Sequence, residues 1–222
     1  MISVILPTRN EPLIGELVKD VNGVLGKKKH EIVIIDLSDH LPKVKGAKVF
    51  PQKTKGLGNA VVEGLEKSRG DVIVVMDADF SHDPKDIPRL LEKLNRGFDF
   101  VIGSRYCEGA STEDKAYRYG IFPNSLISRF YCGLASTLLR LDLKDPMNGF
   151  AVGRRRVYDS IKLNPRGYKI HMETAFKAKK LGFKISEAPT TFHKRRAGKS
   201  NTGMSEAFRT LRFIFELRLG MR

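Results

Sequence analysis

The stretch 71–84 constrains the fold most, because a fully apolar segment there runs directly into acidic residues. Residues 72–76 are all apolar, which is typical of a strand buried on both faces of a parallel sheet. Asp77 and Asp79 follow at the expected end of this strand. Open α/β sheets bind ligands at that edge, and paired carboxylates suit Mg²⁺ or Mn²⁺. A polar turn after a core strand would leave the same pattern, so this pair alone does not decide between the two interpretations.

Strand-like and helix-like segments alternate through the first half of the chain, with connections long enough for parallel pairing. Asn10 is expected to cap the first helix. The expected strands are 2–7, 31–36, 47–50, 71–76 and 98–103, and the expected helices are 10–25, 56–69 and 84–96. The pattern predicts an α/β fold whose mainly parallel, Rossmann-like sheet is flanked by helices.

The second half is less regular. We expect a mobile loop at 108–119 and a solvated helix start at the arginine triplet 154–156. Helices are expected at 126–141 and 171–181, with one or two edge strands at 184–192.

Three carboxylates, Asp36, Asp77 and Asp79, are expected at the ends of neighbouring strands, and their convergence favours a ligand site over a chance turn. Gly56 and Gly58 precede a helix and could bring backbone N–H groups close to a phosphate, although this signal is weak alone. His82 beside these carboxylates is more often a structural residue than a base.

A formal net charge of +15 predicts attraction to an anionic partner, such as a nucleic acid, an acidic lipid surface or a phosphorylated substrate. The loop 194–199 gathers four cationic side chains around Gly198 and suits a phosphate. No apolar run approaches the roughly 20 residues that cross a bilayer. Cys107 and Cys132 lack metal-site or disulfide spacing, so a cytoplasmic chain is expected.

The tail changes character from His193 onward, and a helix is expected to begin at Ser205. We therefore divide the chain into 1–204 and a basic amphipathic helix, 205–222. Arg209, Arg212 and Glu216 make a narrow polar stripe, and apolar residues fill most of the remaining surface. Such a helix either packs on protein or lies at a membrane surface.

Several motifs together resemble the family 2 glycosyltransferases, and more narrowly their dolichyl-phosphate mannose synthase group. The resemblance extends from residue 2 to about 200. In chain order the motifs are VILPTRNE (4–11), Asp36 with Ser38, GLG (56–58), MDADFSHDP (76–84), GSRY (103–106), DPMNGF (145–150) and RRAGKS (195–200).

The resemblance implies a GT-A fold and inverting transfer of mannose from GDP-mannose to dolichyl or another polyprenyl phosphate. It also implies no nucleic acid partner, and contact with the cytoplasmic face of a membrane through the tail helix or an anchoring partner subunit. Residues near the nucleotide would be Pro7, Arg9, Glu11, Asp36, Asp77 and Ala78. Asp77, Asp79 and Ser81 would hold Mg²⁺ or Mn²⁺, with Asp79 also counted as catalytic. Arg105, Ser128, Arg195 and Lys199 would serve the acceptor phosphate, Arg105 and Arg195 as catalytic residues.

The chain departs from the family pattern at Arg9, Leu37 and Asn124, and Lys53 and Lys55 flank the usual lysine position before GLG. A family 2 enzyme with a UDP-sugar donor or another acceptor therefore stays open. So does a Mg²⁺-dependent phosphatase of the haloacid-dehalogenase type, which also carries a strand-end Asp-x-Asp, and a nucleic-acid-binding module suggested by charge alone.

Overall fold

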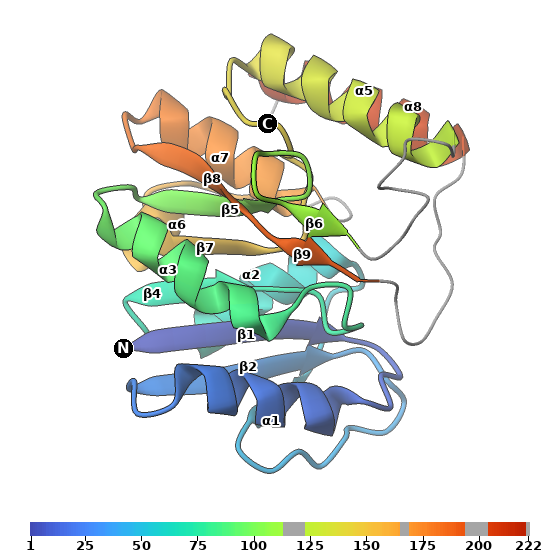
Figure 1. Ribbon diagram of the computed structural model, residues 1–222. Coiled ribbons are helices and arrows are strands. Elements are labelled where there is room, and N and C mark those ends of the chain that lie inside the picture. The colour runs from blue at the N-terminus through green and yellow to red at the C-terminus, as the bar shows by residue number, and fades with distance from the viewer. Residues whose placement is uncertain (113–122, 165–168, 194–203, 221–222) are drawn as a thin grey trace.

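A seven-stranded sheet in the order β3-β2-β1-β4-β7-β5-β8 forms the centre of the computed structural model, which describes residues 1–112, 123–164, 169–193 and 204–220 (Figure 1). Strand β7 runs antiparallel to its neighbours β4 and β5, whereas the other pairs are parallel. A small parallel sheet joins β6 to β9. The strands are β1 (Ile2–Thr8), β2 (His30–Asp36), β3 (Lys48–Pro51), β4 (Val72–Val75), β5 (Phe100–Ser104), β6 (Ser111–Thr112), β7 (Ala151–Arg154), β8 (Ile185–Pro189) and β9 (Thr191–Phe192).

Helices cover both faces of the large sheet. Helices α1 and α3 pack on one face, and α2, α6 and α7 pack on the other (Figure 1). Helices α5 and α8 lie side by side over the second layer and contribute to its core. The bounds are α1 (Ile14–Leu25), α2 (Leu57–Lys67), a 3₁₀ turn η1 (Pro84–Asp86), α3 (Ile87–Asn95), α5 (Pro123–Leu139), α6 (Arg155–Asp159), α7 (Ile170–Lys180) and α8 (Met204–Arg218).

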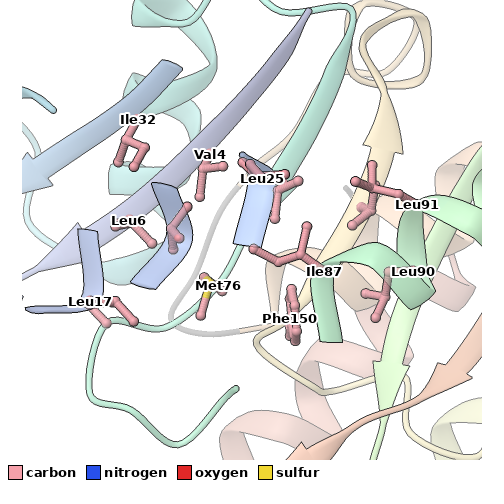
Figure 2. Packing of buried hydrophobic residues seen from close by; sticks show 14 of the residues in the cluster. Val4, Leu6, Leu17, Leu25, Ile32, Met76, Ile87, Leu90, Leu91 and Phe150 are labelled. Atoms are coloured by element: carbon pink, nitrogen blue, oxygen red, sulfur yellow. The ribbon is translucent and has the colours of Figure 1, made fainter. Parts of the chain in front are cut away.

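The continuous apolar strands explain this architecture, because a strand that is apolar on both faces is stable only between two layers of helices. Val4 and Leu6 point toward α1, and Ile5 between them belongs to the core on the opposite face. Figure 2 shows the first of these cores, in which Met76 and Phe150 are fully buried. Both residues immediately adjoin the chemically important segments described below.

The register brings the strand ends to one edge of the sheet. Thr8 pairs with Asp36 at the carboxyl ends of β1 and β2. The carboxyl ends of β4, β5 and β8 fall on the same side, and so does the start of the antiparallel strand β7. The predicted convergence of strand-end residues is therefore confirmed.

Two local predictions are wrong. Helix α1 begins at Ile14, and Asn10 is not its cap: its φ is 51° and its backbone N–H donates to Ser38 Oγ at 2.7 Å. Arg155 and Arg156 do start helix α6, but Arg155 is half-buried and not freely solvated: its guanidinium donates to Gly70 O, Leu65 O and Ser68 Oγ. In the expected loop 108–119, residues 111–112 form β6, and 113–119 lie outside the described residues.

Candidate active site

The ends of β1 and β2 are bonded into one unit. Thr8 Oγ1 donates to Asp36 Oδ2 at 2.6 Å, and the backbone N–H of Ser38 donates to Asp36 Oδ1 at 2.9 Å. Asp36 is only 2% exposed, so both bonds fix a carboxylate with little access to water. These bonds hold the Asp36 side chain in one orientation at the β2 side of the sheet edge.

Asp77 lies against the backbone of a distant loop. A Cβ atom added at Gly149 would come within 2.4 Å of Asp77 Oδ2, so no other residue fits at Gly149 without moving that carboxylate. His82 Nε2 lies 3.5 Å from the same oxygen. His82 is itself buried between the rings of Phe150 and Phe192. Asp77 therefore sits in a narrow, defined position while keeping part of its surface exposed.

Asp79 and Glu11 bring further negative charge to the same edge. Ser81 N–H donates to Asp79 Oδ1 at 3.0 Å. Burial, and secondarily the charge of Asp79, raises the pKa of Glu11. The carboxylates of Glu11 and Asp79 therefore repel each other. Phe80, between Asp79 and Ser81 in sequence, has a φ of 61°, a left-handed conformation that costs energy for a bulky residue and is common at functional sites. We call Glu11, Asp36, Asp77 and Asp79 the acidic edge.

A divalent ion fits the chemistry of the acidic edge, which offers the hard carboxylate oxygens that Mg²⁺ and Mn²⁺ prefer. Within the described part of the chain, no three His, Cys, Asp or Glu residues form a ready-made metal cluster. Mg²⁺ in proteins is commonly held by one or two carboxylates together with substrate phosphates. The predicted ligand Ser81 is 1% exposed.

Arg105 leaves the end of β5 and forms a buried ion pair. Its Nε and Nη2 donate to Asp145 at 2.7 and 2.9 Å, and its backbone N–H donates to the same carboxylate at 3.0 Å. Asp145 is fully buried and also accepts from Asn148. Beyond the cost of burial, the Arg105 guanidinium holds the pKa of Asp145 below its usual value. The sequence did not indicate this pairing, because the two residues are 40 positions apart.

Tyr106 connects the end of β5 to helix α5. Its hydroxyl donates to Ser128 Oγ at 3.0 Å. The guanidinium carbons of Arg105 and Arg129 lie 5.0 and 4.7 Å from the centre of its ring, within the range of cation–π attraction. Burial raises the pKa of Tyr106 to about 12, so the phenol stays neutral. We call Arg105, Tyr106, Ser128 and Arg129 the basic edge.

The chain enters the cationic segment beside the acidic edge. His193 N–H donates to Ser81 O at 3.0 Å, and His193 Nε2 lies 3.4 Å from Asp83 Oδ2. Arg195 and Lys199 themselves lie outside the described residues. Of the other predicted site residues, Pro7 and Ala78 are buried on this edge, whereas Arg9 is exposed.

Fold and site together define a Rossmann-like α/β protein with strand-end carboxylates. Residues 3–162 match the glycosyl transferase family 2 domain, and the chain belongs to that family. Two curated relatives are a dolichol-phosphate mannosyltransferase of Pyrococcus furiosus and a polyprenol monophosphomannose synthase of Mycolicibacterium smegmatis. The first is 37% identical and matches 97% of this chain but 63% of its own length; the second is 30% identical and matches 89% and 79%. The chain thus spans less than two thirds of the first relative.

Solved structures support the GT-A fold. Glucosyl-3-phosphoglycerate synthase from Mycobacterium tuberculosis, in complex with Mn²⁺, uridine diphosphate and glucosyl-3-phosphoglycerate, matches 99% of this chain and 79% of its own. Its TM-score is 0.67 at 19% identity. Mannosyl-3-phosphoglycerate synthase from Rubrobacter xylanophilus gives a TM-score of 0.66 at 20% identity, matching 99% and 74%. The predicted GT-A fold class is confirmed.

Proposed function

We propose that the protein transfers mannose from GDP-mannose to dolichyl or another polyprenyl phosphate, with inversion and with Mg²⁺ or Mn²⁺. One observation carries the proposal: Asp77 and Asp79 share a sheet edge with Arg105 and the Tyr106–Ser128 pair, in a chain 37% identical over 97% of its length to a dolichol-phosphate mannosyltransferase. An acidic half and a basic half of one edge suit a metal-bound diphosphate and an anionic acceptor respectively.

The acidic edge would take the donor. The nucleotide would lie along Pro7, Arg9, Glu11, Asp36 and Ala78. Asp77, Asp79 and Ser81 would hold the divalent ion, which when bound supplies charge neutralisation to the departing diphosphate. The residues of the chain then contribute mainly orientation: Asp36 is fixed by Thr8 and Ser38, and Asp77 by its close contact with Gly149.

The basic edge would take the acceptor phosphate through Arg105 and Ser128, joined by Arg195 and Lys199 from the cationic loop. A phosphate monoester is already anionic, so the attack on the sugar needs no strong general base. His82 suits a supporting role, because it is 2% exposed and contacts Asp77. The charged pair Arg105–Asp145 would orient the guanidinium before the acceptor arrives.

The surface formed by α5 and α8 would bring the protein to a membrane. Three large apolar residues of α5, two of α8 and one just after the end of α8 are exposed by 47–74%. Arg209 and Arg212 are exposed on α8 and could reach lipid phosphates, as in interfacial helices. No helix in the described residues could span a bilayer. The apolar residues are Leu126, Ile127, Phe130, Phe208, Phe215 and Leu219.

We propose that the protein binds peripherally at the cytoplasmic face of a membrane, alone or with an anchoring partner subunit. The acceptor lipid would then present its phosphate close to Ser128, which lies on α5 between the exposed residues Ile127 and Phe130. The helix α8 also packs inward through Phe213, Ile214 and Leu217. We keep the division at residue 204 as a proposal.

A transfer assay tests the proposal directly. The protein is incubated with Mn²⁺, dolichyl phosphate in detergent, and radiolabelled GDP-mannose, GDP-glucose, UDP-glucose or UDP-GlcNAc. We expect a labelled lipid from GDP-mannose only, and none after chelation of the ion. Transfer from a UDP-sugar would change the proposed donor, but the proposed glycosyl transfer to a polyprenyl phosphate would stand. An absence of transfer from every donor, together with an absence of nucleotide binding, would refute the proposal.

A further inference from the structure

Two buried histidines lie near Asp77, and the proposed reaction gives neither of them a proton to transfer. His82 follows Asp77 and Asp79 in sequence. His171 belongs to α7, which packs on the sheet face opposite α1 and α3. Each histidine is 2% exposed. His82 Nε2 lies 3.5 Å from Asp77 Oδ2. The ring of His171 interacts with the backbone of Gly149 and with the charges of Asp77 and His82. Both rings thus converge on one carboxylate.

Burying these rings is costly. The Nδ1 atoms of both histidines have no hydrogen-bond partner within the described part of the chain. An unsatisfied buried polar group is destabilising, whereas an apolar residue of similar size would carry no such penalty. Stability alone therefore does not account for two histidines here.

The geometry around Gly149 supplies a reason. The Asp77 carboxylate occupies the space beside Gly149 that a side chain there would need, since an added Cβ would lie 2.4 Å from Asp77 Oδ2. The neighbours Met76 and Phe150 are fully buried in the core shown in Figure 2 and fix both chain segments from below. His171 reaches Gly149 from the opposite layer, and His82 closes the remaining side. The Asp77 carboxylate therefore borders Gly149 and His82, and His171 reaches it through Gly149.

We propose that His171 and His82 are positioning residues that fix the orientation of Asp77 for the divalent ion and donor diphosphate, with His171 acting through the Gly149 backbone. The inference rests on the proposed function, because it assumes that Asp77 faces the donor. Groups that orient metal ligands from behind typically contribute 10- to 100-fold in metal affinity or activity, by order of magnitude.

The test compares His171→Leu with His171→Gln, which restores a side-chain hydrogen-bonding group. Calorimetry measures the binding of Mn²⁺ with GDP, and of Mn²⁺ with UDP, without turnover. We expect His171→Leu to weaken nucleotide binding by about 10-fold or more and His171→Gln to recover most of it. In transfer assays the KM for the donor should rise while the KM for dolichyl phosphate stays unchanged.

Thr174→Val is the matched control. Thr174 is fully buried on the same helix and donates to Ile170 O at 2.8 Å, away from Asp77. Its loss should lower the melting temperature without changing nucleotide affinity. If Thr174→Val weakens binding as much as His171→Leu does, or if a folded His171→Leu binds like wild type, the inference is wrong.

His82→Leu and His82→Gln repeat the comparison should His171→Leu fail to fold. Wild-type affinity in the His82→Leu protein would equally overturn the inference. A wild-type protein that binds neither nucleotide would refute the proposed function and this inference together. If wild type transfers mannose and the histidine variants bind nucleotide as tightly as wild type, the inference alone is refuted.

Discussion

The acidic edge and the basic edge of the site differ in how they are built. The acidic edge comes from the ends of three adjacent parallel strands, β1, β2 and β4, with Asp36 and Asp77 held by short bonds and close backbone contact. The basic edge joins the end of β5 to a helix: Tyr106 bonds to Ser128 on α5, whose neighbours Ile127 and Phe130 are exposed. One half is fixed by the sheet, and the other half depends on a surface helix.

This difference matches the chemistry proposed for each half. A small charged donor is recognised best by preorganised groups that need no rearrangement. A lipid acceptor must be approached from a membrane, so its contacts have to lie beside an apolar surface. Substitutions at the acidic edge should therefore affect the donor alone, and substitutions around α5 should affect the acceptor and the membrane.

The largest effect is expected for Asp79→Ala. Loss of this carboxylate removes a proposed ion ligand and should lower kcat/KM by about 10²- to 10³-fold, the range found when a single electrostatic stabilising group is removed. Transfer of radiolabelled mannose to dolichyl phosphate measures it. Asp71→Asn is the control, since Asp71 precedes the opposite end of β4 and its carboxylate pairs with the N-terminal amine. Retained activity in Asp79→Ala would remove Asp79 from the reaction.

Asp145→Ala should destabilise the protein by about 3–5 kcal/mol, because it leaves the Arg105 guanidinium buried without its partner. Urea unfolding monitored by circular dichroism gives the change. Asp142→Ala is the matched control: Asp142 pairs with Lys179 at the surface, where an ion pair contributes about 0–1 kcal/mol. Equal losses in the two variants would contradict a special role for the buried pair.

The same pair predicts a pH dependence. Arg105 holds the pKa of Asp145 below its usual value, so the contribution of this carboxylate to stability is complete above the unfolded-state pKa of about 3.9. It is lost as the pH falls through the lower folded-state pKa. Urea unfolding at a series of acidic pH values should show a steeper loss of stability in wild type than in Asp145→Ala. Parallel curves would contradict this assignment.

The contrast between the edges also separates what the sequence could predict from what it could not. The sheet, its alternating helices and the convergence of Asp36, Asp77 and Asp79 followed from apolar runs that end in carboxylates, a local pattern. Asn10 was wrongly predicted to cap the first helix, because asparagine is common both at helix caps and in the left-handed conformation that it adopts in this turn.

Contacts between residues far apart in sequence could not be predicted from local patterns. The bond between Arg105 and Asp145 and the contact of Asp77 with Gly149 join residues tens of positions apart, and no periodicity marks them. The hydrogen bonds of Arg155 to residues 65–70 were missed for the same reason, since a run of arginines is usually solvated. Only the packing of β7 between β4 and β5 brings these segments together.

On the acceptor side, Phe130→Ser combined with Phe208→Ser should weaken membrane binding. These residues are 66% and 74% exposed on the paired helices α5 and α8. Burying one phenylalanine contributes about 1.5–3 kcal/mol, so the double variant should bind vesicles at least about 10-fold more weakly. Cosedimentation with anionic phospholipid vesicles measures this. Leu181→Ser, at an exposed leucine just after α7, is the control and should bind normally; unchanged binding by the double variant would contradict the membrane surface.

The smallest effect is expected for Tyr106→Phe, which removes one hydroxyl and tests the link between the sheet and α5. The aromatic ring, and with it the contacts to Arg105 and Arg129, remains. Loss of the bond to Ser128 should cost about 0.5–1.5 kcal/mol. If that bond positions Ser128 for the acceptor, the cost falls on the KM for dolichyl phosphate and leaves the KM for the donor unchanged. Ser128→Ala should then match Tyr106→Phe, and the double variant should add little, because both changes remove the same bond. A donor-specific effect would show instead that the two edges are coupled through β5.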